Sequence, residues 1–295
     1  MTTPNVVERI ADLRAILDAA RADGKRVGFV PTMGFLHEGH ASLMRKARAE
    51  NDVVLVSIFV NPLQFLPSED FEAYPRDLDR DLAVCAAEGV DLVFHPSVEE
   101  MYPEPTTFTV TVGPIGEILE GKTRPGHFDG VATVVAKLFN IAGPCRAYFG
   151  EKDAQQLVVI RRLARQLVFP VEVIGCPTIR EPDGLAMSSR NIYLKGAERE
   201  AATALKRGLD EGARLIADGE RSGPKIRDAI ASRIKQEPRA RLDYAACLDP
   251  DTLGDAAEVD GPVLLAMAAW VGKARLIDNM TVSPASSQAP GRGPR

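Results

Sequence analysis

Short apolar runs separated by helical patterns are the feature that most constrains the fold of this 295-residue chain. Val27 to Val30 and Val53 to Phe59 are two such runs, and the second is rich in β-branched residues. Strands that are apolar on both faces are typical of a parallel sheet covered by helices on both sides. The alternation therefore predicts an α/β domain, in which ligands bind beyond the carboxyl ends of the strands.

This alternation continues to about residue 176 and defines a first domain over residues 1–176. In it we expect helices over 6–21, 42–50, 77–88, 130–141 and 154–168, and strands over 27–30, 53–59, 91–94, 145–149 and 171–174. Over residues 177–283 we expect a smaller α+β lid domain with an antiparallel sheet. Its expected helices span 197–217 and 225–236, and its expected strands span 242–248, 263–269 and 274–280. Residues 284–295 are rich in Pro, Gly and Ser, which is typical of a disordered tail.

Composition excludes several classes of protein. The net charge of −5 gives no basic face for nucleic acid, so we expect no nucleic-acid partner. Four cysteines are widely spaced and form no C-x-x-C pair, which argues against a zinc knuckle or a thioredoxin motif. The N-terminus carries early charges and no apolar signal core, and the longest apolar stretches are too short to cross a bilayer. We therefore expect a cytoplasmic protein with no membrane partner.

Two histidines mark the point where the first apolar run gives way to a helical pattern. Residues 31–40 read Pro-Thr-Met-Gly-Phe-Leu-His-Glu-Gly-His, so His37 and His40 precede the helix expected from Ser42. A helix N-terminus carries unpaired N–H groups and the positive end of the helix dipole, and it binds phosphate readily. We expect the two imidazoles to add hydrogen-bond donors toward the same anion, and Gly39 to let a ligand lie close to the backbone.

A metal site is the main alternative for this histidine pair. His-x-x-His can be half of such a site, but no third ligand of the usual kind is near, and Glu38 would point to another face of the helix. Two surface histidines without a role are a further alternative. The chain has four histidines, however, and two of them fall at this junction. The pattern therefore favours phosphate chemistry, with no metal held by protein side chains.

Polar residues also follow two later strands. Asn61 and Gln64 come directly after the strand expected over 53–59 and supply amide donors and acceptors there. Taken alone, this segment favours a polar turn with a structural asparagine. Lys152 and Asp153 come after the strand over 145–149 and before a helix. Lys152 can bind phosphate, whereas Asp153 can cap the helix or contact a ribose hydroxyl.

A third polar segment, Met187-Ser188-Ser189-Arg190, places two hydroxyls beside an arginine. Arginine is suited to spreading charge on a phosphoryl group, so the segment predicts an anion clamp. Gly184 nearby indicates a loop, and a mobile loop is what a closing lid would need. A plain surface turn is the alternative.

One motif match is misleading. Residues 116–123 fit the P-loop expression G-x-x-x-x-G-K-[ST] letter for letter. A P-loop needs a helix that starts at its lysine, and Pro125 and Gly126 follow too soon to allow one. We therefore expect no phosphate cradle of that type here.

Taken together and in this order, the motifs resemble the pantoate–β-alanine ligase family. The resemblance runs from Val27 through Asn191 and continues more weakly to about Thr281. Its markers are Pro31-Thr32-Met33-Gly34, His37-Glu38-Gly39-His40, Phe59-Val60-Asn61-Pro62 with Gln64-Phe65, Arg124-Pro125-Gly126-His127-Phe128, Gly150-Glu151-Lys152-Asp153 with Gln156, and Met187-Ser188-Ser189-Arg190. The family belongs to the nucleotidylyltransferases that share a His-x-Gly-His signature on a Rossmann-like sheet.

The resemblance implies ATP, pantoate and β-alanine as substrates, Mg²⁺ as cofactor, and a homodimer. It implies that the pantoate carboxylate attacks the α-phosphate of ATP and that pyrophosphate leaves. The amine of β-alanine then attacks the pantoyl adenylate, which gives pantothenate and AMP.

The same resemblance implies roles for particular residues. The catalytic residues would be His37, His40, Lys152, Ser188, Ser189 and Arg190. The ATP site would contain these and also Pro31, Thr32, Met33, Gly150, Asp153, Ile179 and Met187. The residues that contact pantoate or β-alanine would be Gln64, Gln156, Asn61, Met33 and Phe149. The roles of Arg124 and His127 stay open.

Three other functions are alternatives to this one. A nucleotidyl transferase with a phosphorylated acceptor would need more cations and no amide pair such as Gln64 and Gln156. A class I aminoacyl-tRNA synthetase fragment would need a basic domain for tRNA, and this chain is acidic. A non-catalytic nucleotide sensor would bind ATP without releasing pyrophosphate.

Overall fold

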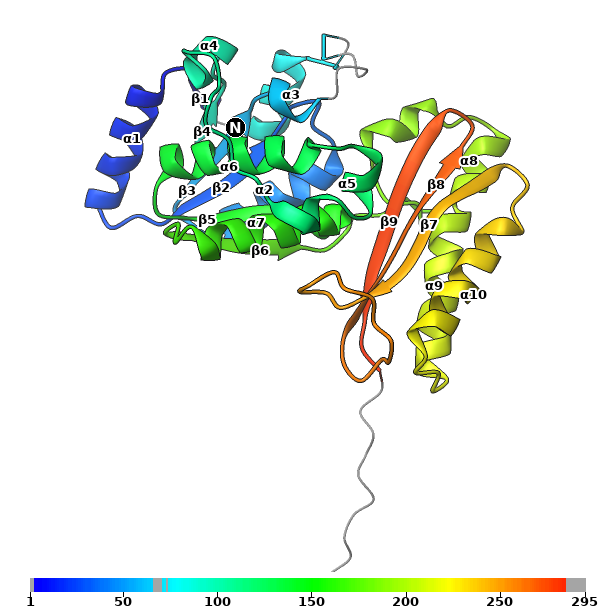
Figure 1. Ribbon diagram of the computed structural model, residues 1–295. Helices are drawn as coiled ribbons and strands as arrows, with labels where there is room; N and C mark the ends of the chain where they lie inside the picture. The colour runs from blue at the N-terminus through cyan, green and yellow to red at the C-terminus, as the bar shows by residue number, and fades with distance from the viewer. Residues whose placement is uncertain (1–2, 66–70, 73, 285–295) are drawn as a thin grey trace, which may run out of the picture. The chain divides into compact units, whose positions relative to one another are not determined.

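The computed structural model describes residues 3–65, 71–72 and 74–284, and its internal contacts divide the chain into two compact units (Figure 1). The first unit comprises residues 1–179 and 187–189, and the second comprises residues 180–186 and 190–295. Apart from Pro284, the predicted disordered tail over 284–295 lies outside the described residues.

The first unit is built on a parallel sheet, as the apolar runs predict. Its strands lie in the order β1-β4-β3-β2-β5-β6. Their bounds are Asn5–Val7 (β1), Val27–Thr32 (β2), Val53–Ile58 (β3), Leu92–Phe94 (β4), Cys145–Gly150 (β5) and Val171–Cys176 (β6). β2 and β3 are buried almost throughout and carry no charged residue. The predicted α/β class is confirmed for this unit.

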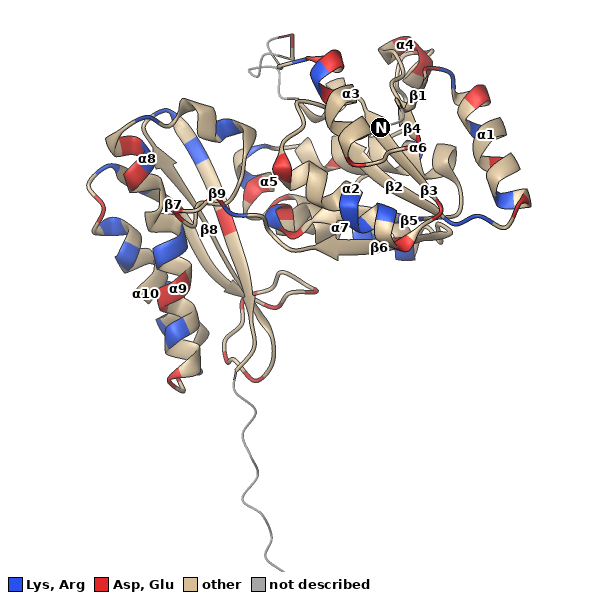
Figure 2. Ribbon diagram, turned by 180° about the vertical axis from the view of Figure 1, so that it is seen from behind, with Lys and Arg blue, Asp and Glu red and all other residues tan. Residues whose placement is uncertain are grey.

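Helices cover both faces of this sheet. α6 (His127–Ala142) packs against α1 (Ile10–Ala22) and α7 (Ala154–Gln166), whereas α2 (Glu38–Glu50) packs against α3 (Leu78–Ala87). Two shorter helices, α4 (Val98–Met101) and α5 (Glu120–Thr123), and the 3₁₀ turns η1 (Pro62–Gln64), η2 (Gly113–Gly116) and η3 (Glu151–Asp153) lie in the connections. Charged residues of both signs lie along the helices of this unit, while its inner strands carry few of them (Figure 2).

The strand order reverses beside β2, which sets the place of the site. From β2 the chain moves to β3 and β4 on one side, and it then returns to β5 on the other side. Open α/β sheets bind ligands at the carboxyl ends of the strands at such a reversal. The segments that follow β2 and β5 contain His37 and Lys152, so the topology brings these two motifs to the same edge.

Several predicted elements differ from the structure in their bounds. The helix predicted over 42–50 begins at Glu38, so His40 lies in its first turn rather than before it. The helix predicted over 6–21 begins at Ile10, because residues 5–7 instead form β1, whose pairing partner β4 is distant in sequence. The helix predicted over 197–217 is broken into α8 (Ala197–Ala202) and α9 (Ala204–Ala217). At the break, the Thr203 hydroxyl donates to the Glu200 carbonyl at 2.7 Å, and this side-chain bond competes with the helical ladder.

The second unit has its own antiparallel sheet, which confirms the α+β expectation. Its strands are β7 (Ala240–Leu248), β8 (Val263–Val271) and β9 (Ala274–Val282), in that order. α9 and α10 (Gly223–Lys235) pack against this sheet, and their apolar faces form a separate core with it. β6 is followed by the irregular segment 177–188 and by the 3₁₀ turn η4 (Ser189–Tyr193).

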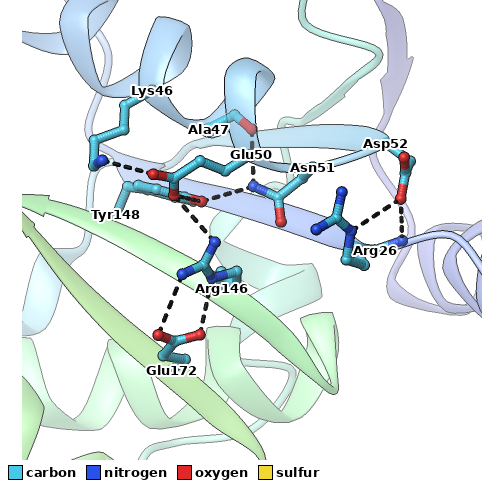
Figure 3. Close-up of polar contacts among 9 residues, drawn as sticks. All are labelled: Arg26, Lys46, Ala47, Glu50, Asn51, Asp52, Arg146, Tyr148 and Glu172. Carbon is cyan, nitrogen blue, oxygen red and sulfur yellow. Dashed lines mark hydrogen bonds and ion pairs between the residues drawn. The ribbon is translucent and has the colours of Figure 1, made fainter.

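A polar network joins α2 to β5 and β6 (Figure 3). The Tyr148 hydroxyl donates to Glu50 Oε2 at 2.8 Å and accepts a hydrogen bond from Asn51 Nδ2 at 2.7 Å. Arg146 joins Glu50 to Glu172 with bonds of 3.2 and 2.8 Å. Arg146 lies near the start of β5, so the network ties the layers together at the end of the sheet opposite to the histidines.

Candidate active site

A buried carboxylate from α3 holds the turn that leads from β2 to the histidines. Asp81 is 1% exposed, and its two oxygens accept hydrogen bonds from the N–H groups of Phe35 and Leu36 at 2.8 and 2.7 Å. Burial raises the pKa of this carboxyl, and the two N–H groups oppose the rise. Gly34 and Phe35 have φ values of 82° and 51°, a conformation that turns the chain sharply. Asp81 thus fixes how the chain enters His37.

His37 and His40 lie against each other at the start of α2, with ring centroids 4.1 Å apart. His37 is the N-cap of α2, and its Nδ1 accepts from the N–H of Gly39 at 3.1 Å. His40 Nδ1 accepts from the N–H of His37 at 3.3 Å, which completes a reciprocal capping box. Because each Nδ1 is an acceptor, the proton of each neutral ring is on Nε2. Each imidazole therefore has an Nε2–H donor.

Both imidazoles are neutral at pH 7. Burial lowers the pKa of His37, and the nearby Lys152 ammonium lowers it further. Burial lowers the pKa of His40 to about 3, with a smaller contribution from His37. The pair therefore offers hydrogen bonds to an anion rather than positive charge.

The backbone of this helix start differs from the sequence expectation. The N–H of Gly39 is bound to His37 Nδ1, and the N–H of His40 donates to the His37 carbonyl at 2.8 Å. These two N–H groups are bonded inside the turn, so they do not have the unpaired state that the sequence predicts for a helix start. A Cβ at position 39 would lie 2.8 Å from His37 Cε1. Gly39 therefore makes room for the His37 ring itself.

Lys152 and Asp153 bring opposite charges to this place from the end of β5. The Lys152 ammonium lowers the pKa of both histidines, and the Asp153 carboxylate raises it. The two side chains lie 3.4 Å apart. Asp153 precedes α7, but its side chain makes no capping hydrogen bond, so of its two alternative roles the structure contradicts the helix cap. A Cβ at Gly150 would meet nothing within 4 Å, which leaves open space beside this backbone.

Gln64 lies at the end of η1, next to the end of β2. Its side-chain Nε2 contacts Met33 Sδ, and its Oε1 lies 3.4 Å from Asn61 Nδ2. Its backbone carbonyl accepts from His127 Nδ1 at 2.8 Å and from Arg124 Nη2 at 3.3 Å. In the structure, Arg124 and His127 therefore hold the backbone of Gln64 in position.

Other predicted site residues are engaged inside the protein. Asn61 is 1% exposed and bonded to protein groups through both amide atoms, so it supports the site from within. The Thr32 hydroxyl donates to the Ser57 carbonyl at 2.7 Å. Phe149 is buried and packs against Phe139, because its side chain points from β5 into the helix layer. A direct substrate contact of these residues stays a prediction.

The remaining predicted residues lie at strand ends or in the later segment. Pro31 and Met33 are at the end of β2, and Gln156 is in the first turn of α7. The N–H of Met187 donates to the Ile179 carbonyl at 2.9 Å. Met187, Ser188 and Ser189 belong to the first unit, whereas Arg190 belongs to the second.

The P-loop-like segment does not form a phosphate cradle. α5 starts before Lys122 and ends at Thr123, two residues before Pro125. The N–H groups of Gly121 and Lys122 both donate to the Ile118 carbonyl. The N–H of Glu120 donates to Gln155 Oε1 at 2.9 Å. These amides serve the local fold.

Sequence reasoning missed Asp81, although a signal for it exists. The segment around it looks like a solvated acidic face. Leu78 and Cys85 lie three residues before and four residues after Asp81, so helical periodicity puts all three on one face. A carboxylate on an apolar helix face is buried, and a buried carboxylate needs donors. Tyr102, which donates to Asn61, was also missed, and no local pattern points to it.

In the part of the chain that the structure describes, there is no cluster of three or more His, Cys, Asp or Glu residues suited to hold a metal ion. Within the same residues, every helix is too short or too polar to cross a bilayer.

Comparison with known proteins gives one consistent result. A pantothenate synthetase of Thermotoga neapolitana is 54% identical over 274 residues, which cover 93% of this chain and 98% of that protein. The pantothenate synthetase structure from Thermus thermophilus has a TM-score of 0.88 at 49% identity and covers 94% of this chain and 98% of its own. A Francisella tularensis pantoate–β-alanine ligase complexed with β,γ-ATP and β-alanine has a TM-score of 0.75 at 38% identity, with coverage of 94% and 97%.

The family profile described as pantoate-beta-alanine ligase matches residues 5–281, which is nearly the whole chain. The parallel sheet, the histidine pair at its edge and the order of the motifs agree with this match. The chain belongs to the pantoate–β-alanine ligase family.

Proposed function

We infer that this protein is an AMP-forming ligase that joins pantoate to β-alanine at the expense of ATP. Its product is pantothenate, formed through a pantoyl adenylate. The observation that carries this proposal is the meeting of the His37–His40 pair with Lys152 at the carboxyl edge of the sheet, in a chain of this family.

The proposed chemistry needs donors at the phosphates rather than a protein nucleophile. The pantoate carboxylate attacks the α-phosphorus, the bond to pyrophosphate breaks, and charge builds up on the phosphate oxygens. Donors fixed in advance stabilise such charge without reorganisation. His37 and His40 would supply neutral Nε2–H donors, and Lys152 would supply the positive charge. Ser188, Ser189 and Arg190 would hold the triphosphate, with Pro31, Thr32, Met33, Gly150, Asp153, Ile179 and Met187 in the nucleotide pocket.

The donors at this edge of the sheet fit a Mg²⁺ ion that arrives with the nucleotide. This ion usually binds through one or two carboxylates together with substrate phosphates, and it seldom has a full protein cage. Asp153 is a half-exposed carboxylate beside Lys152 and therefore fits as one such ligand. When bound with ATP, the ion would neutralise charge on the departing pyrophosphate.

The second step needs β-alanine and the exclusion of water. Gln64 and Gln156 would bind pantoate, with Asn61, Met33 and Phe149 shaping that part of the site. We propose that the domain over 177–283 acts as a lid, because a mixed anhydride survives only where water is kept out. We also propose that the enzyme works as a cytoplasmic homodimer.

An omission assay tests the activity. AMP and pyrophosphate are measured with ATP, pantoate and β-alanine, and each substrate is left out in turn. Release of AMP should require all three, while pyrophosphate release in a first turnover should require only ATP and pantoate. AMP formation without dependence on pantoate and β-alanine contradicts the proposal, and ATP binding with no pyrophosphate release favours a nucleotide sensor.

Variants of the histidines test the assigned roles. His37→Ala and His40→Ala should each slow adenylate formation on the order of 10²-fold or more, as for loss of a donor that acts in the transition state. Both residues also cap α2, so His37→Asn is the informative control. Asparagine is a good N-cap but has no Nε2–H donor. It should keep the thermal stability of the wild type and still react slowly. A wild-type rate of adenylate formation in His37→Asn would show that His37 only caps α2 and takes no part in the reaction.

A further inference from the structure

We propose that Tyr102 is a positioning residue that orients the Gln64 amide toward pantoate. The inference rests on the proposed role of Gln64 in substrate binding. Tyr102 follows α4, which lies well away from η1 in the sequence. Its hydroxyl oxygen is 2.7 Å from Asn61 Oδ1. It would act on the substrate only through Asn61 and Gln64.

The direction of each hydrogen bond follows from Asn61. The Gly130 carbonyl can only accept, and it lies 3.1 Å from one end of the Asn61 amide, which must therefore be Nδ2. The other end, Oδ1, then faces the Tyr102 hydroxyl, which must donate. Asn61 is 1% exposed, so water does not compete for either end.

The orientation of the Asn61 amide in turn determines the orientation of the Gln64 amide. The second hydrogen of Asn61 Nδ2 points to Gln64 Oε1 at 3.4 Å. The oxygen of the Gln64 amide is thereby turned toward Asn61, and its Nε2 faces Met33 at the end of β2. One hydrogen of Nε2 is directed to Met33 Sδ, and the second would serve as the donor that a carboxylate or hydroxyl oxygen of pantoate needs.

The Tyr102 hydroxyl is held as a permanent donor. Its ring lies near Phe59, with centroids 6.2 Å apart, and Lys137 Nζ is 4.8 Å from the ring centroid. Burial raises the pKa of the phenol above its usual value, so the hydroxyl keeps its proton at neutral pH. Because the contacts with Phe59 and Lys137 involve the ring and not the hydroxyl, we expect the ring to stay in place when only the hydroxyl is removed.

The backbone of Gln64 cannot shift to compensate. His127 and Arg124 both bind its carbonyl. A Cβ at Gly130 would lie 2.2 Å from the Leu63 carbonyl oxygen, so η1 already lies close against α6. With the backbone held, the orientation of the Gln64 side chain depends on Asn61. Three groups orient Asn61: the Gly130 carbonyl, the N–H of Leu63, which donates to Asn61 Oδ1 at 3.4 Å, and the Tyr102 hydroxyl, which makes the shortest of these bonds at 2.7 Å.

Steady-state kinetics of Tyr102→Phe test this chain of contacts. KM for pantoate should rise about threefold to tenfold, the change that loss of one neutral hydrogen bond produces. KM for ATP should stay within about twofold. In the Gln64→Ala background, Tyr102→Phe should add nothing to KM for pantoate, because the residue to be oriented is gone. Tyr148→Phe is the matched control, since it also removes a tyrosine hydroxyl but at the other end of the sheet, and both KM values should stay unchanged.

Each other outcome has a definite meaning. An unchanged KM for pantoate in Tyr102→Phe, an equal rise in both KM values, or an additive effect in the double variant overturns the proposal. If Gln64→Ala alone leaves KM for pantoate unchanged, the assigned role of Gln64 fails first, and the positioning role of Tyr102 fails with it. If Gln64→Ala raises this KM and Tyr102→Phe does not, only the positioning role fails.

Discussion

The imidazoles of His37 and His40 serve two purposes through their two nitrogens. Nδ1 of each ring accepts a backbone N–H and completes the cap of α2, which leaves the proton on Nε2. Burial lowers the pKa of His40 to about 3, and the neighbouring His37 adds to this effect. One pair of residues thus starts the helix and supplies neutral donors to the proposed phosphate site. The fold needs both rings uncharged, which has a consequence for stability.

Stability should fall as the pH falls from about 6.5 to about 3. An unfolded histidine binds a proton below about 6.5, whereas folded His40 binds one only below about 3. Between these values the unfolded chain holds more protons, so the free energy of unfolding decreases as the pH drops. Urea unfolding at pH 7 and pH 5 measures the difference.

His40→Gln isolates the contribution of this residue. Glutamine at this position of a capping box can still accept the N–H of His37 but does not titrate. The loss of unfolding free energy between pH 7 and pH 5 should be smaller in this variant than in the wild type. An equal loss in both proteins would show that the burial of neutral His40 contributes nothing to acid sensitivity.

At the level of secondary structure, the two ends of the parallel sheet have different tasks. The carboxyl ends of β2 and β5 lead to the proposed reactive groups, and they are followed by irregular segments. Near the start of β5, hydrogen bonds among Glu50, Arg146, Tyr148 and Glu172 connect α2, β5 and β6. We therefore expect changes in this network to affect stability and to leave substrate binding unchanged.

Tyr148→Phe should lower the free energy of unfolding by about 1 kcal/mol, the usual net value of one hydrogen bond. Glu50 keeps its ion pairs with Lys46 and Arg146, so no charge is left alone. Urea unfolding at pH 7 measures the change. Arg26→Gln is the control, because the Arg26–Asp52 pair is exposed and should contribute less than about 0.5 kcal/mol. Equal effects of the two variants would mean that the buried hydroxyl adds no stability.

The molecule as a whole consists of two units with separate apolar cores. In the second unit, Arg180 forms an ion pair with a buried carboxylate. Arg180 binds both oxygens of Asp278 at 2.7 and 2.9 Å, and the Asp278 side chain is 1% exposed. Arg180 also donates to the Gly184 carbonyl at 3.0 Å, which ties the segment before Met187 to β9.

Arg180→Leu should destabilise the second unit by about 3–5 kcal/mol, because it leaves a buried carboxylate without its partner. Hydrogen exchange measured by mass spectrometry should show faster exchange in β7 to β9 and little change in β2, β3 and β5. The double variant Arg180→Leu/Asp278→Asn removes both charges and should recover much of the protection. Equal acceleration in both sheets would show that the two cores unfold as one.

Local sequence determines most of the strands and helices of this protein. The apolar runs around Phe29 and Leu55 specify strands, and helical spacing specifies most of the helices, because these signals depend only on neighbouring residues. The order of the motifs led to the family, which the comparisons confirm. His37 and Lys152 each follow a predicted strand in the sequence, and this alone predicts that they lie at one edge of the sheet.

Tertiary structure decided what depends on distant partners. Asn5 to Val7 become a strand only because β4 offers them an edge, and Asp81 becomes a structural acceptor only because Phe35 and Leu36 meet it. The tautomer of His37, the reason for Gly39 and the link from Tyr102 to Gln64 likewise arise from contacts across the fold. Local residues determine which elements form, whereas burial and hydrogen-bond partners determine what each polar group in them can do.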